Sequence, residues 1–151
     1  NLVPKVALDG EAPDLIARKV RDASARLYAA PEYLDRVGRR GTAAEFSDAE
    51  FIEIDDQGSL MHLLNDSGFA LTGANFPYRC RNFTVMWEMV RRGMGIGVID
   101  DRIGDNDPHV VRALPGFGPI GFPVWLAAHR DIARSRRLRL VFDALVEGLG
   151  P

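Results

Sequence analysis

The stretch RNFTVMWEMVRRGMGIGVID, residues 81–100, decides how this chain folds. Asn82 is a residue type favoured at the N-cap of a helix, and the apolar residues 83, 86, 87 and 90 recur at the spacing of one helix face. Gly93 is placed to end that helix, and residues 96–99 form a short apolar run. The stretch therefore predicts an amphipathic helix that leads into a buried strand.

The start of this predicted helix is a candidate site for a small carboxylate. A helix N-terminus carries unpaired N–H groups and a partial positive charge, both of which favour a bound anion. Asn82 and Thr84 would offer N–H groups and a hydroxyl, Phe83 would cover an apolar part of the ligand, and Arg81 would add a charge-assisted hydrogen bond. The alternative is that the run is a plain helix–strand core unit, with Arg81 as an ordinary solvated arginine.

Composition excludes several classes of function. The 151 residues are 46% hydrophobic and 26% charged, which suits about one domain with a sizeable core. A net charge of −2 gives no electrostatic reason to bind nucleic acid, and no apolar run approaches the roughly 20 residues that cross a bilayer. With one cysteine and three histidines that lack ligand spacing, we expect no disulfide, no metal site and no cofactor.

The rest of the chain alternates strand and helix patterns, so an α/β fold is predicted. A helix is expected at 32–37 after Pro31, a polar loop at 39–48, and a final helix capped by Ser135 with residues 138, 141, 142, 145 and 149 on one apolar face. The glycine- and proline-rich residues 115–123 are the best candidate for a connection between lobes. Strands or extended segments are expected at 3–8, 15–20, 25–30, 51–54, 69–72, 110–114 and 123–129.

The string LIARKVRDASARLYAAPEYLDRVG, residues 15–38, resembles the middle of the effector-binding domain of LysR-type transcriptional regulators. Three further stretches agree with that family in order and spacing. They are the Asn-led helix with its GMGIG ending, VVRALP at 110–115, and PVWLAAHRDIARSRRLRLVFDALVEGL at 123–149. The resemblance therefore covers nearly the whole chain.

The resemblance implies a fold like that of type 2 periplasmic binding proteins, with two α/β lobes and a small ligand in the cleft between them. Carried onto this sequence, residues 1–26 and 122–151 belong to lobe I, residues 27–117 form lobe II, and residues 118–121 form a crossover. We expect lobe I to be incomplete in this chain. We also expect the DNA-binding winged helix-turn-helix to be absent from it.

The resemblance also implies where the effector binds. Asp9, Gly10 and Glu11 stand at the position where the family places cleft residues of the first lobe. On the second lobe, the implied contacts are those already singled out at the start of the predicted helix, namely Arg81, Asn82, Phe83 and Thr84.

The function that follows is effector sensing by a bacterial LysR-type regulator. The domain would bind a small organic acid or metabolite, without catalysis, and so control DNA binding and transcription. The resemblance implies a cytoplasmic dimer or tetramer that touches no membrane and contacts DNA only through the absent N-terminal domain. The alternatives are an extracytoplasmic solute-binding protein and an enzyme on a related two-lobed fold; a nucleophile motif such as G-x-S-x-G is absent.

Overall fold

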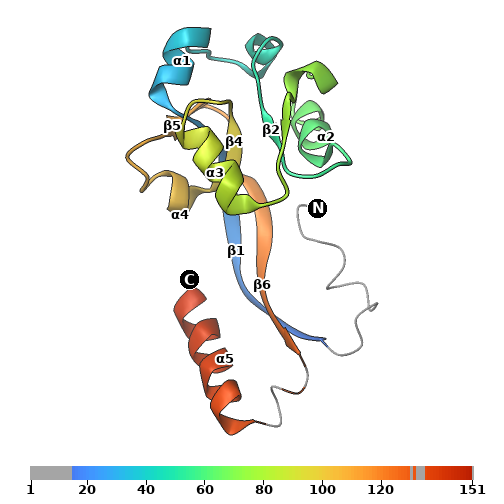
Figure 1. Ribbon diagram of the computed structural model, residues 1–151, viewed down its shortest axis with the longest axis vertical. Coiled ribbons are helices and arrows are strands. Elements are labelled where there is room, and N and C mark those ends of the chain that lie inside the picture. Colours follow the sequence, from blue (N-terminus) through green and yellow to red (C-terminus); the bar gives the residue numbers. More distant parts are fainter. Residues whose placement is uncertain (1–14, 130, 132–134, 151) are drawn as a thin grey trace. The chain divides into compact units, whose positions relative to one another are not determined.

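The computed structural model describes residues 15–129, 131 and 135–150 (Figure 1). The predicted strand at 3–8 and the residues Asp9, Gly10 and Glu11 lie outside this described part. The strands are β1 (Leu15–Ala29), β2 (Ile52–Glu53), β3 (Tyr78–Arg79), β4 (Gly97–Asp100), β5 (Val111–Arg112) and β6 (Ile120–His129). The α-helices are α1 (Pro31–Val37), α2 (Ser59–Asp66), α3 (Phe83–Arg91), α4 (Asp101–Gly104) and α5 (Arg136–Leu149), with 3-10 turns η2 (Ala43–Phe46) and η3 (Gly73–Asn75).

The chain divides into two compact units. Unit 2 comprises Ala25–Ile120, and unit 1 takes the described residues on either side of that range. The long strand β1 contributes its first part to unit 1 and its last part to unit 2. Its partner β6, drawn in orange beside the blue β1 in Figure 1, belongs almost entirely to unit 1.

Strands of unit 2 take part in two sheets. One is built around the end of β1, and the other pairs β2 with β3. The end of β1 lies between β4 and β5 and is antiparallel to both, with Leu27 opposite Val98 and Tyr28 opposite Arg112. β2 pairs in parallel with β3, and a parallel bridge joins the preceding residue, Phe51, to Ile96. Both α2 and α3 therefore start after the carboxyl end of a parallel strand.

The core of unit 2 gathers around Tyr28 of β1. Its ring meets that of Trp87 edge to face, with the ring centroids 6.0 Å apart. α3 contributes Met86, Trp87 and Val90, as its apolar spacing predicted, whereas Phe83 in its first turn is half exposed. The cluster of buried residues is Tyr28, Ile52, Met86, Trp87, Val90, Ile99 and Val110.

One sequence expectation in unit 2 is wrong, and one of its helices was not expected. Residues 69–72 are not a strand, because the side chain of Asn65 bonds both backbone groups of Leu71. Its amide oxygen accepts from the N–H of Leu71 at 2.8 Å, and its NH₂ group donates to the carbonyl of Leu71 at 2.9 Å. The unpredicted helix α2 has no capping side chain at its N-cap, Gly58, which lies in the left-handed region. Its capping groups come from β2 and the loop that follows it. The expected polar loop at 39–48 also contains the 3-10 turn η2.

In the described part of the chain, unit 1 consists of the first part of β1, nearly all of β6, and α5. Ser135 caps α5 as predicted, its hydroxyl accepting a hydrogen bond from the N–H of Leu138 at 3.5 Å. Of the predicted apolar face of this helix, Phe142 is buried and the remaining members are exposed. Those exposed members are Leu138, Val141, Leu145 and Leu149.

A close contact between Gly104 and Tyr28 yields the first prediction. A Cβ atom added at Gly104 would lie 2.3 Å from Cζ of the Tyr28 ring. We expect Gly104→Ala to lower the free energy of unfolding by about 1–3 kcal/mol through overpacking, measured as a lower urea midpoint. Gly118→Ala is the control, since no atom lies within 4 Å of its added Cβ. Equal midpoints for the two variants would contradict the packing described.

The burial of Tyr28 leads to a prediction of how the free energy of unfolding changes at alkaline pH. Burial raises the pKa of Tyr28 from its ordinary value of 10.0 to about 12, and the hydrogen bond to Asp105 adds to this. A raised pKa in the folded state gives stability that is complete below pH 10.0 and is lost as the pH rises to about 12. In urea unfolding, Tyr28→Phe should flatten this decline, and Tyr78→Phe, at an exposed residue, should not. The same slope in wild type and Tyr28→Phe would exclude the effect.

Candidate functional site

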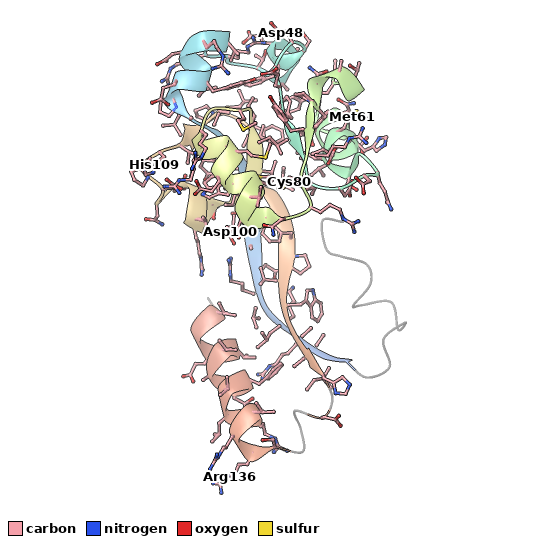
Figure 2. The ribbon with its side chains drawn as sticks, in the orientation of Figure 1. Asp48, Met61, Cys80, Asp100, His109 and Arg136 are labelled. Atoms are coloured by element: carbon pink, nitrogen blue, oxygen red, sulfur yellow. The ribbon has the colours of Figure 1, made fainter. Side chains whose placement is uncertain are left out.

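The candidate site lies where the parallel strands β2 and β3 end. In α/β sheets, ligands bind outside the carboxyl ends of parallel strands, close to the helix N-termini that follow. Here the chain leaves β2 for α2 and leaves β3 for α3. Met61 in the first turns of α2 and Cys80 just before α3 are labelled in Figure 2. Two helix N-termini therefore follow this edge, and their hydrogen bonding differs.

The N-terminus of α2 is already occupied by the protein's own carboxylates. Glu53, at the end of β2, is 1% exposed, and its two oxygens accept from the N–H groups of Leu60 at 3.1 Å and Met61 at 3.3 Å. Asp55 accepts from the N–H of Ser59 at 3.2 Å, and its hydrogen bond with the Ser59 side chain lowers the pKa of Asp55. An external anion would have to compete with both groups.

The N-terminus of α3 is open. Asn82 caps the helix as predicted, its side-chain oxygen accepting from the N–H of Val85 at 3.1 Å. Its carbonyl accepts from the N–H of Met86 at 2.9 Å. Within the described residues, the backbone N–H groups of Phe83 and Thr84 have no hydrogen-bond acceptor. Two donors at the positive end of the helix are thus available to a ligand.

The residues around this open terminus combine apolar surface with one weak ion pair. The residues Phe83 and Tyr78 are 51% and 37% exposed. Arg81 lies 3.7 Å from Asp56 of the loop before α2, with both side chains more than two-thirds exposed. Exposed pairs of this kind contribute about 0–1 kcal/mol, so the guanidinium can exchange Asp56 for another anion.

The structure brings the four predicted residues 81–84 together at one helix start because they are consecutive. It places Asp56 beside them, which the sequence did not indicate, since Asp56 stands in an acidic loop with no motif around it.

Among the described residues, no group of three or more His, Cys, Asp or Glu side chains is arranged to hold a metal ion. In the same part of the chain, no helix combines the length and apolar character of a membrane span.

The sequence model of the LysR substrate binding domain matches residues 6–150. The chain belongs to this family. A curated relative, the HTH-type transcriptional regulator CrgA of Neisseria meningitidis serogroup C (strain 8013), is 29% identical over 153 residues. That match covers 93% of this chain and 50% of CrgA, so the chain spans half the length of this relative.

Solved structures of the same family share the fold. The regulatory domain of CrgA from Neisseria meningitidis aligns with a TM-score of 0.73 at 23% identity, covering 99% of this chain and 72% of that domain. The AmpR effector binding domain from Citrobacter freundii aligns with a TM-score of 0.70 at 14% identity, covering 90% of this chain and 68% of that domain. The predicted family and the α/β fold of the periplasmic-binding-protein type are confirmed.

The capping role of Glu53 yields a prediction about α2. Glu53→Gln keeps the size of the side chain but replaces one accepting oxygen with an NH₂ group that faces backbone donors. We expect the free energy of unfolding to fall by about 1–3 kcal/mol, measured by urea denaturation. Asp66→Asn, at the exposed C-terminal end of the same helix, should change it by less than about 0.5 kcal/mol. A loss for Asp66→Asn as large as that for Glu53→Gln would argue against the capping role.

Proposed function

We propose that this chain is the effector-sensing domain of a LysR-type transcription regulator and binds a small organic acid or similar metabolite at the start of α3. The observation that supports this most is the contrast between the two helix N-termini. α2 is capped by the buried Glu53, whereas α3 leaves the N–H groups of Phe83 and Thr84 without acceptors among the described residues. The named curated relative is a regulator, in keeping with binding without catalysis.

The proposed chemistry assigns each residue a separate contact. A carboxylate would accept hydrogen bonds from the N–H groups of Phe83 and Thr84 and from the Thr84 hydroxyl. Arg81 would turn from Asp56 to the ligand, at little cost because that pair is exposed. The rings of Phe83 and Tyr78 would cover the apolar part of the ligand.

The proposal extends to the lobes of the domain. Residues 27–117 would form lobe II, residues 1–26 and 122–151 lobe I, and residues 118–121 the crossover. The compact unit Ala25–Ile120 supports a boundary near these positions. The proposed lobe I contacts at Asp9, Gly10 and Glu11 rest on the resemblance alone.

For the whole protein, we propose a cytoplasmic dimer or tetramer that contacts DNA through a helix-turn-helix segment outside these 151 residues. Effector binding would act by changing the relative populations of two arrangements of the domain. A ligand that binds one arrangement of the domain more tightly than another favours that arrangement, by no more than the difference in binding free energy. The change would alter how paired subunits present their DNA-binding segments.

A carboxylate panel tests the binding site. The ¹⁵N-labelled 151-residue chain is titrated with aliphatic and aromatic carboxylates and with the matching neutral amides. We expect at least one acid, and not its amide, to shift the NMR signals of the Phe83 and Thr84 N–H groups. Thr84→Val should weaken that binding roughly 5–10-fold, since it removes one hydrogen bond worth about 1 kcal/mol.

Thr42→Val serves as the matched control, because Thr42 caps η2 and takes no part in α3. It should leave the affinity unchanged. Shifts confined to residues elsewhere in the chain, or equal binding of acid and amide, would remove the start of α3 as the effector site.

Sequencing the gene ahead of the Asn1 codon tests the regulatory role separately. A reading frame that encodes a helix-turn-helix pattern is the expected result. A secretory signal followed by further lobe I sequence would instead indicate an extracytoplasmic solute receptor, whatever the carboxylate panel shows.

A further inference from the structure

A charged cluster joins the last turns of α3 to the loop between α4 and β5. Its centre is Asp107, whose side chain is 13% exposed. One carboxylate oxygen accepts from the indole N–H of Trp87 at 2.9 Å and lies 3.2 Å from Nε of Arg91. The other accepts from the backbone N–H of His109 at 3.0 Å. This cluster takes no part in the proposed effector site.

The ring of His109, labelled in Figure 2, completes the cluster through one atom. Its Nδ1 lies 2.9 Å from Nη2 of Arg91 and 3.1 Å from Oδ1 of Asp107. A guanidinium can only donate hydrogen bonds and a carboxylate can only accept them, whereas Nδ1 carries either a lone pair or a proton. The two contacts therefore cannot both be hydrogen bonds in the same protonation state.

We propose that the protonation of His109 decides which of these two partners its Nδ1 bonds. Protonation would thereby break the hydrogen bond between Arg91 of α3 and His109 of the α4–β5 loop. The neutral ring carries its proton on Nε2 and accepts from Arg91 through Nδ1. When the ring gains a second proton, Nδ1–H donates to Asp107, and Arg91 loses that contact and faces a positive charge. The hydrogen bond from Arg91 to Nδ1 is lost, and a hydrogen bond from Nδ1 to Asp107 forms in its place.

The charged groups around His109 act in opposite directions. Asp107, from the loop, favours the protonated ring, and Arg91, from α3, opposes it. Glu88, one turn before Arg91, forms an ion pair with the Arg91 guanidinium and so offsets part of its charge. Although burial acts against it, hydrogen bonds from the backbone N–H of His109 and from the indole of Trp87 keep the pKa of Asp107 below its ordinary value. Asp107 thus remains ionised and able to accept a hydrogen bond from the ring.

Trp87 makes the exchange observable, because its indole N–H donates to the carboxylate that His109 would engage. A new hydrogen bond to Asp107 withdraws electron density from both oxygens and weakens the bond from Trp87. We expect the indole N–H signal of Trp87 to move with the same midpoint as the His109 ring when the pH is lowered. The signals are assigned with Trp125→Phe and His109→Asn, and His109→Asn should abolish the Trp87 shift.

The decisive experiment reads the tautomer of neutral His109 by long-range ¹H–¹⁵N NMR of the 151-residue chain. The wild type should carry its proton on Nε2, because Arg91 occupies Nδ1. In Arg91→Met, the nearby carboxylate should draw the proton to Nδ1 and reverse the major tautomer. Arg92→Met is the matched control: Arg92 lies 3.6 Å from the same Glu88 carboxylate in an ion pair but has no contact with His109.

Three outcomes would overturn the proposal. The first is a proton on Nδ1 in the neutral wild-type ring, and the second is an unchanged tautomer in Arg91→Met. The third is a Trp87 indole signal that does not follow the titration of His109. The last measurement needs no substitution at Arg91, so it stands even if Arg91→Met fails to fold. None of these measurements involves an effector, so the result is independent of the proposed function.

Discussion

The burial of the last residues of β1 is the constraint on which unit 2 depends. Leu27, Tyr28 and Ala29 are almost inaccessible and lie between β4 and β5, so their side chains meet the core from a backbone that is bonded on both edges. A slip of one residue would turn every one of these side chains to the opposite face. The position of Tyr28 then fixes its neighbours. Trp87 packs against its ring, and Gly104 must lack a side chain because the ring lies so close. Asp105 accepts a hydrogen bond from its hydroxyl.

The candidate site arises from a difference in how two similar helix starts are satisfied. A buried carboxylate is costly unless it is hydrogen-bonded, and Glu53 meets that condition by accepting from the donors at the start of α2. α3 has a shorter capping group in Asn82, which serves Val85 and leaves the two preceding N–H groups open. The part of the helix that the protein does not satisfy is the part that a ligand can use.

α3 connects this site with the cluster around Asp107. Its first turn presents the open N–H groups, its middle contributes Trp87 to the core, and its last turn contributes Arg91 to the contact with His109. The same helix therefore carries a surface for an anion at its positive end and a charged contact near its other end. A short helix held by a buried middle can present different chemistry at each terminus without changing its packing.

The sequence by itself determined the family, the α/β class, and the elements whose signals are local. Asn82 and Ser135 cap their helices, and the spacing of Met86, Trp87 and Val90 gives the buried face of α3, because caps and periodicity act within a few residues. Only the tertiary structure decided which side chains satisfy polar groups outside their own helix or strand. Glu53 caps α2, the amide of Asn65 replaces a strand partner for 69–72, and Arg91 meets His109 18 residues away. No local pattern encodes such pairs, since the fold alone brings their atoms within hydrogen-bond distance.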